Sequence, residues 1–125
     1  MCSSDLQQVS GAWSYHFQNG IAEYMTGQWD APTGGALNLS CRSDGTVAIA
    51  TQIKGKAPPP GSMLKLATSS RQGTHVIALP TNGQGIASIS STDTRFRALW
   101  AQLRAKDIVS IRYADGRPSV HSLAG

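Results

Sequence analysis

The stretch "ALNLSCRSDGTVAIATQI", residues 36–53, decides the fold class. Its first half alternates apolar with polar residues, at Leu37, Leu39 and Cys41, as far as the Arg-Ser-Asp-Gly sequence of residues 42–45. Its second half alternates again, at Val47, Ile49, Thr51 and Ile53. Alternation at period two is typical of a strand with one buried face, and Asp-Gly is a favoured hairpin turn. The stretch therefore predicts an antiparallel hairpin.

Two more hairpins are predicted on the same grounds. In "WSYHFQNGIAEYMTG", residues 13–27, aromatic residues alternate up to Asn19-Gly20. Asn-Gly is a strong hairpin signal because a type I′ turn needs positive φ at both central residues. The chain closes with "DIVSIRYADGRPSVHSL", residues 107–123, in which another Asp-Gly pair separates two short strand-like runs. The strand ending at Leu123 is expected to pair with "DIVSIRY".

The middle of the chain predicts single short strands and one connector. Strand-like runs lie at residues 63–68, 74–79 and 85–90, separated by "SSRQG" and "PTNGQ" turns. The segment "KGKAPPPGS", residues 54–62, cannot join a sheet, because three consecutive prolines fix φ and remove three backbone donors. It is expected to be a connector.

A change of period predicts one helix. In "STDTRFRALWAQLRAKD" the apolar residues fall at i, i+3, i+4 and i+7, which is the spacing of a single helical face. Thr92 or Asp93 can cap its start. The helix is expected near residues 93–105, with its apolar face formed by Phe96, Leu99, Trp100 and Leu103.

These elements predict a mainly β protein, either a small antiparallel β-sandwich or a partly open barrel built from hairpins. The amphipathic helix is expected to pack over an end or edge of a sheet. The expected core is a single cluster of apolar residues from the strands and the helix: Trp13, Tyr15, Leu37, Leu39, Val47, Ile49, Ile53, Phe96, Leu99, Trp100, Leu103, Val109 and Ile111.

Length and composition favour a single exported domain. The chain has 125 residues, 13 glycines and only 14% charged residues, against about 25% in an average soluble domain. No apolar stretch approaches the roughly 18 residues that a membrane-spanning helix needs. The start, "MCSSDLQQVSGAW", lacks the basic and apolar regions of a secretory signal. The protein is therefore cytosolic, or its true start is missing.

The charge is unevenly distributed along the chain. The net charge is +4, but all eleven Lys and Arg residues lie after residue 41. Five of these basic residues lie on or beside the predicted helix or in the next strand. They form a candidate basic binding face: Arg95, Arg97, Arg104, Lys106 and Arg112. The alternative is an ordinary solvated surface. Nucleic acid is not expected as a partner, because Phe96 and Trp100 face the core and leave no aromatic platform for base stacking.

No pattern of catalytic or metal-binding residues is present. His16, His75 and His121 each lie in a different predicted strand, and neither His-x-His nor Cys-x-x-Cys occurs. Asp44 and Asp115 belong to turns, and no G-x-S-x-G motif is found. The sequence therefore predicts no enzyme activity, no metal and no cofactor.

Three stretches carry a resemblance to a known family: "WSY", "LNLSCRSDGTVAIATQI" and "FRALWAQLRAKDIVSIRYADGRPSVHSLAG". They resemble small exported proteobacterial proteins of the invasion-associated locus B type and the periplasmic accessory protein of type VI secretion loci. The resemblance covers most of residues 12 to 125. It implies a periplasmic or secreted protein whose closing strand is followed by a further segment. It also implies that Cys41 pairs with a cysteine beyond Gly125.

Without the resemblance, the sequence predicts a different state for the cysteines. The chain has two, and Cys2 lies in a polar tail with no sequence reason to approach Cys41 within the roughly 4–7 Å Cα separation of a disulfide. Cys41 is therefore expected to be a thiol in this chain. A buried free cysteine that acts as a small apolar side chain fits the same observation.

The first six residues, "MCSSDL", are expected to be foreign to the protein. Read as the codons GTG TGC TCT TCC GAT CT, they look like the end of a sequencing adapter fused to a gene fragment of metagenomic origin. The alternative is an ordinary N-terminus. On the first interpretation, residues 7–125 are a single β-rich domain truncated at both ends.

Three functions are left by the sequence. The first is a non-enzymatic exported envelope or secretion accessory protein that binds another envelope or secreted protein. The second is a periplasmic inhibitor of the lysozyme-inhibitor type, because those proteins are also small β-domains stapled by cysteines. The third is a hydrolase with a site built from dispersed residues.

Overall fold

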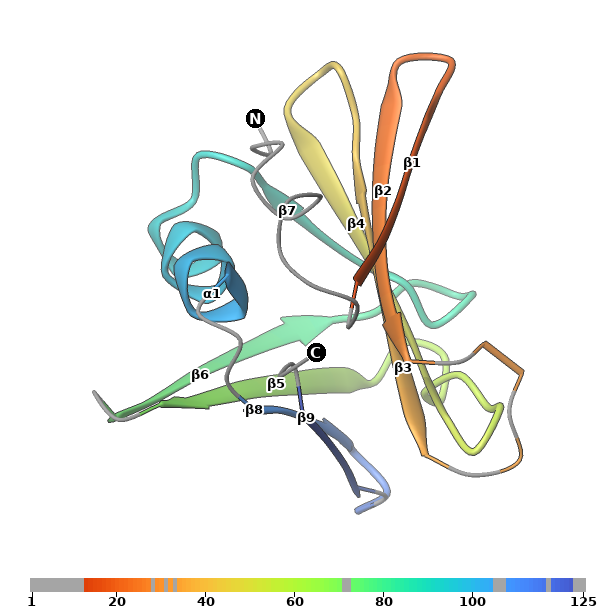
Figure 1. Cartoon of the computed structure of the whole chain (residues 1–125). Coiled ribbons are helices and arrows are strands. Elements are labelled where there is room, and N and C mark those ends of the chain that lie inside the picture. The colour runs from red at the N-terminus through yellow and green to blue at the C-terminus, as the bar shows by residue number, and fades with distance from the viewer. Residues whose placement is uncertain are drawn as a thin grey trace.

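The computed structural model describes residues 13–27, 29–30, 32, 34–70, 73–104, 108–116 and 118–122. They form two antiparallel sheets and a helix, so the predicted class, a small β-sandwich, is confirmed. In Figure 1 the strands of the two sheets run in different directions, and the helix α1 lies in the angle between them. Among the described residues, no helix is long and apolar enough to cross a membrane.

The first sheet has the strand order β1-β2-β3-β4-β7. Its strands are β1 (Trp13–Gln18), β2 (Ile21–Gly27), β3 (Gly35–Cys41), β4 (Thr46–Ile53) and β7 (Ala87–Ser90). The second sheet has the order β6-β5-β8-β9. Its strands are β5 (Met63–Ser70), β6 (Gly73–Pro80), β8 (Ile108–Tyr113) and β9 (Pro118–Ser122), and α1 spans Thr94–Arg104.

All three predicted hairpins are confirmed, as β1–β2, β3–β4 and β8–β9. The first turns at Asn19 and Gly20, whose φ values of 55° and 78° are the positive pair that a type I′ turn requires. In the second, Gly45 has φ 89°, and the Asp44 carboxylate accepts a 2.8 Å hydrogen bond from the Thr46 amide. Local turn chemistry therefore sets the register of both hairpins.

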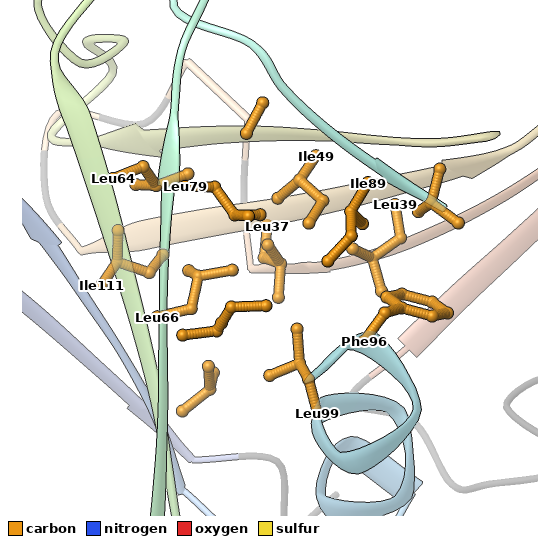
Figure 2. Close-up of a cluster of buried hydrophobic side chains, with 14 of the residues drawn as sticks. Leu37, Leu39, Ile49, Leu64, Leu66, Leu79, Ile89, Phe96, Leu99 and Ile111 are labelled. Carbon is orange, nitrogen blue, oxygen red and sulfur yellow. The ribbon is translucent and has the colours of Figure 1, made fainter. Parts of the chain in front are cut away.

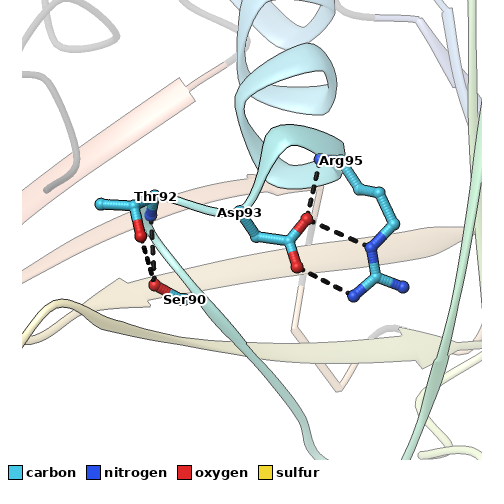
Figure 3. Close-up of polar contacts among 4 residues, drawn as sticks. All are labelled: Ser90, Thr92, Asp93 and Arg95. Carbon is cyan, nitrogen blue, oxygen red and sulfur yellow. Dashed lines mark hydrogen bonds and ion pairs between the residues drawn. The ribbon is translucent and has the colours of Figure 1, made fainter.

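Asp93, one of the two residues predicted to cap the helix, is the cap of α1 (Figure 3). Its carboxylate accepts a 2.8 Å hydrogen bond from the Arg95 backbone N–H, which has no partner inside the first turn of the helix. Thr92 belongs to the preceding turn, where its amide donates to the Ser90 hydroxyl at 3.2 Å. The helix thus begins where the sequence changes period.

One hydrophobic cluster joins both sheets and α1 (Figure 2). Ten of the predicted core residues are buried in it: Leu37, Leu39, Val47, Ile49, Ile53, Phe96, Leu99, Trp100, Val109 and Ile111. Tyr15 is half-buried against Tyr24, and the side chains of Trp13 and Leu103 lie outside the described residues. The structure adds further members from the strands: Tyr24, Leu64, Leu66, Ile77, Leu79, Ala87, Ile89 and Tyr113.

Two aromatic residues tie the layers together. Trp100 of α1 packs edge-on against Tyr24 of β2, with ring centroids 5.2 Å apart, so the helix contacts both sheets. The Tyr113 hydroxyl of β8 donates to the Lys56 carbonyl at 2.9 Å and lies 3.2 Å from Thr51 Oγ1. Lys56 belongs to the proline-rich connector, which forms no strand, as predicted.

Cys41 corrects one expectation. It is buried at the end of β3 and is disulfide-bonded. The prediction that Cys41 is a thiol in this chain is therefore wrong, and so is the interpretation of Cys41 as a buried free cysteine. The other cysteine of the chain, Cys2, lies outside the described residues, as does the "MCSSDL" stretch. Separation along the chain is a poor guide here, because the entropy of closing a loop grows only slowly with its length. A cysteine beyond Gly125 is not needed to pair Cys41.

Candidate binding face on the second sheet

The residues of the candidate basic binding face that the sequence predicts do not form one surface. On α1, Arg95 is exposed but bound to Asp93, with Nη2 2.9 Å from Oδ2 and Nε 3.1 Å from Oδ1. Asp93 raises the pKa of Arg95 through these hydrogen bonds. Arg97 is exposed, whereas the Arg104 side chain and Lys106 lie outside the described residues. One of the helix arginines therefore serves the helix start.

Arg112 lies on a different face of the molecule. It is exposed in β8 between Ile111 and Tyr113, which are both buried in the core. Because side chains alternate along a strand, Arg112 points away from the core, whereas α1 packs on the core side of the same sheet. Arg112 and the helix arginines thus cannot contact one flat partner surface together.

Lys65, which the sequence analysis did not single out, is the neighbour of Arg112. The two residues are directly opposite each other in the β5–β8 ladder, and both are exposed. Like charges at such positions repel each other, because the Cβ atoms of opposed residues lie only about 4.5–5.5 Å apart. The four strands of this sheet contain no Asp or Glu to compensate. The signal in the sequence is the alternation of Lys65 with Leu64 and Leu66, which requires an outward lysine.

A hollow of about 390 Å³ adjoins this pair. It is lined by residues of β5, β8 and the turn after β8: Met63, Lys65, Arg112, Tyr113, Ala114 and Gly116. Met63 is 44% exposed beside the two cations. We call the outward surface around Met63, Lys65 and Arg112 the basic face. It combines positive charge with apolar surface, and so can accept an anionic side chain together with an apolar one.

A second hollow, of about 310 Å³, lies on the first sheet and is lined by His16, Gln18, Asn19, Ile21 and Glu23. His16 Nε2 and Gln18 Oε1 lie at a hydrogen-bond distance of 2.9 Å, and the hydroxyl of a nearby serine donates to Glu23 at 3.4 Å. That serine, Ser40, contacts the carboxylate and not the imidazole, so the order differs from a Ser–His–acid triad.

Metal ligands are likewise dispersed. Among the residues that the structure describes, no group of three or more His, Cys, Asp or Glu side chains comes together. His75 lies in β6 and His16 in β1, on different sheets. His121 lies in β9, and its side chain is not described. The basic face is therefore the arrangement with the clearest chemical preference among the described residues.

Comparison with models of protein families finds a match. The model of the YfjT family matches residues 11–125. No curated protein and no solved structure matches the chain.

Proposed function

We propose that this chain, which belongs to the YfjT family, is a non-enzymatic exported protein that acts by binding another protein. Its role is that of an envelope or secretion accessory factor, and its partner is an envelope or secreted protein with an acidic surface. Export and the accessory role rest on the resemblance of "LNLSCRSDGTVAIATQI" and the C-terminal stretch to such proteins.

The observation that carries the binding role is the opposed pair of cations, Lys65 and Arg112, on the basic face of a sheet whose four strands contain no Asp or Glu. Two opposed cations cost stability, and an acidic partner would turn this repulsion into attraction on both sides. Met63 and Val76 are the exposed large apolar residues of this sheet among the described side chains, and neither has a ring for base stacking. A protein partner therefore fits the basic face better than a nucleic acid does.

Site-directed photo-crosslinking tests the assignment. A benzophenone amino acid replaces Met63 on the basic face in one variant and Ser88, exposed on the first sheet, in another. In cells that carry the gene with its upstream sequence, the Met63 variant should give a crosslink to one defined protein, and the Ser88 variant should not. The proposal is wrong if only the Ser88 position crosslinks. Fractionation of the same cells tests export.

One observation favours the enzyme-inhibitor alternative. Phe17 is 61% exposed in β1, next to the type I′ turn at Asn19 and Gly20. A stiff hairpin that presents an aromatic side chain can enter the cleft of an enzyme such as lysozyme. Inhibition of lysozyme by the protein, lost in Phe17→Ser and retained in Lys65→Glu, would favour this function over the first.

A further inference from the structure

Strand β6 has a free edge. Among the described residues, Gly73–Pro80 pairs in a sheet with β5 alone, and the next residue, Thr81, forms an isolated bridge with Ala87 of β7. The directions of the N–H and C=O groups in β6 follow from Thr81, the residue after the strand. The Thr81 N–H donates to the Ser62 carbonyl at 2.9 Å and therefore points towards β5. Successive residues of a strand point their N–H groups to opposite edges. The N–H and C=O groups of Val76 and Ala78 therefore point to the free edge.

This edge lacks the usual protection against strand addition. The eight residues of β6 include no Lys, Arg, Asp or Glu, although edge strands are commonly blocked by charges, prolines or bulges. The one proline, Pro80, is the last residue of the strand. The helix α1 contacts both β6 and β5 on the core side of the sheet. Val76 is 57% exposed on the outward side.

The register connects this edge to the basic face. Ala78 is opposite Lys65, and Lys65 is opposite Arg112, so the three residues form one row across the sheet. A strand added beside β6 would lie two strand spacings, about 10 Å, from β5. Ala78 is short, so a glutamate on the added strand, opposite Ala78, can extend over it towards Lys65.

We propose that an extended acidic segment of the partner protein adds to β6 as a further strand of the second sheet. Its backbone bonds to Val76 and Ala78, and an outward acidic side chain pairs with Lys65. This inference rests on the proposed function and names its recognition mode. A second copy of this chain fits less well, because residues 73–80 carry no acid to meet Lys65.

Binding of two synthetic peptides tests the pairing. One is an acetylated and amidated octapeptide that alternates Glu with Thr, and the other has the same composition with Glu in adjacent pairs. Because side chains of a strand alternate between its faces, only the first directs every Glu to the basic face. It should bind at least tenfold more tightly by titration calorimetry. Equal affinities would overturn the proposal.

The backbone contact is tested on the peptide, which leaves the protein unchanged. The alternating peptide is N-methylated on its Glu amides in one version and on its Thr amides in another. Only one set of amides faces β6, so one version should lose at least tenfold in affinity and the other should retain it. Equal affinity of both versions would contradict strand addition.

Variants of the protein separate the two levels of the proposal. Val76→Pro removes an edge N–H that β5 does not use, and Phe17→Pro is the matched control at the free edge of the first sheet. Val76→Pro should weaken binding of the alternating peptide at least tenfold, and Phe17→Pro should not. Loss of binding in Lys65→Glu with full binding in Val76→Pro would overturn strand addition while leaving the basic face in place. Full binding in Lys65→Glu would contradict the proposed function itself.

Discussion

At the scale of the residue, Lys65 and Arg112 are placed where charge opposes folding. Their side chains lie opposite each other on an outward face, and the four strands of that sheet contain no Asp or Glu. Such an arrangement is expected where a surface serves a partner, because selection for stability alone would separate the charges. The pair can therefore be tested without knowing the partner.

Lys65→Glu should stabilise the protein while it weakens binding. The substitution replaces a repulsive pair by an attractive one, and cross-strand pairs of this kind contribute roughly 0.2–1 kcal/mol. The urea midpoint should rise in Lys65→Glu and return towards the native value in the Lys65→Glu/Arg112→Glu double variant, which restores like charges. A midpoint that falls in the single variant would contradict the described register.

Asp93 gives a pH dependence at the start of α1. The hydrogen bonds from the Arg95 side chain, and then from its backbone N–H, lower the pKa of Asp93 below the usual 3.8. A lowered pKa stabilises the folded state above pH 3.8, and this stabilisation is lost as the pH falls through the lowered pKa. Thermal midpoints of the native protein and of Asp93→Asn should therefore differ most near neutral pH and converge in acid. A constant difference would contradict the pairing.

At the scale of the element, local patterns predicted nearly every strand and the helix. Turn residues such as Asn19-Gly20 and alternation such as Leu37 to Cys41 act over a few residues, so they can be read from the chain alone. The boundaries moved slightly: β5 and β6 extend beyond the predicted runs, and β7 begins at Ala87 instead of residue 85. Residues at strand ends are held by their partners across the sheet, which the local pattern does not specify.

Trp100 tests the packing of α1 on the sheets. It is buried and contacts Phe96 and Tyr24, and its indole N–H has no hydrogen-bond partner among the residues that the structure describes. Trp100→Ala should cost about 3–5 kcal/mol, the range for large core aromatics. Trp100→Phe should cost clearly less, because it keeps a ring and removes the unsatisfied N–H. Equilibrium unfolding measures both, and equal losses would contradict this environment.

At the scale of the whole molecule, the order of strands in the sheets was not predictable from the chain. The second sheet places β5 between β6 and β8, and β7 crosses to the first sheet beside β4. The β5–β8 and β4–β7 pairings join segments far apart in sequence, and no local signal encodes them. For the same reason the basic face was only partly predicted: Arg112 was singled out, but its neighbour Lys65 lies far away along the chain. The bonded state of Cys41 is a long-range property of the same kind.

The central claim is that the outward side of the second sheet, and not the helix arginines, binds an acidic partner. The most direct test is the dissociation constant of the crosslinked partner, once purified, for two double variants with the same change in net charge. Lys65→Glu/Arg112→Glu should weaken binding at least tenfold, whereas Arg95→Glu/Arg97→Glu should leave it within about twofold of native, because these residues lie on the other side of the sheet. Equal weakening by both variants, or a larger loss from the helix variant, would contradict the account.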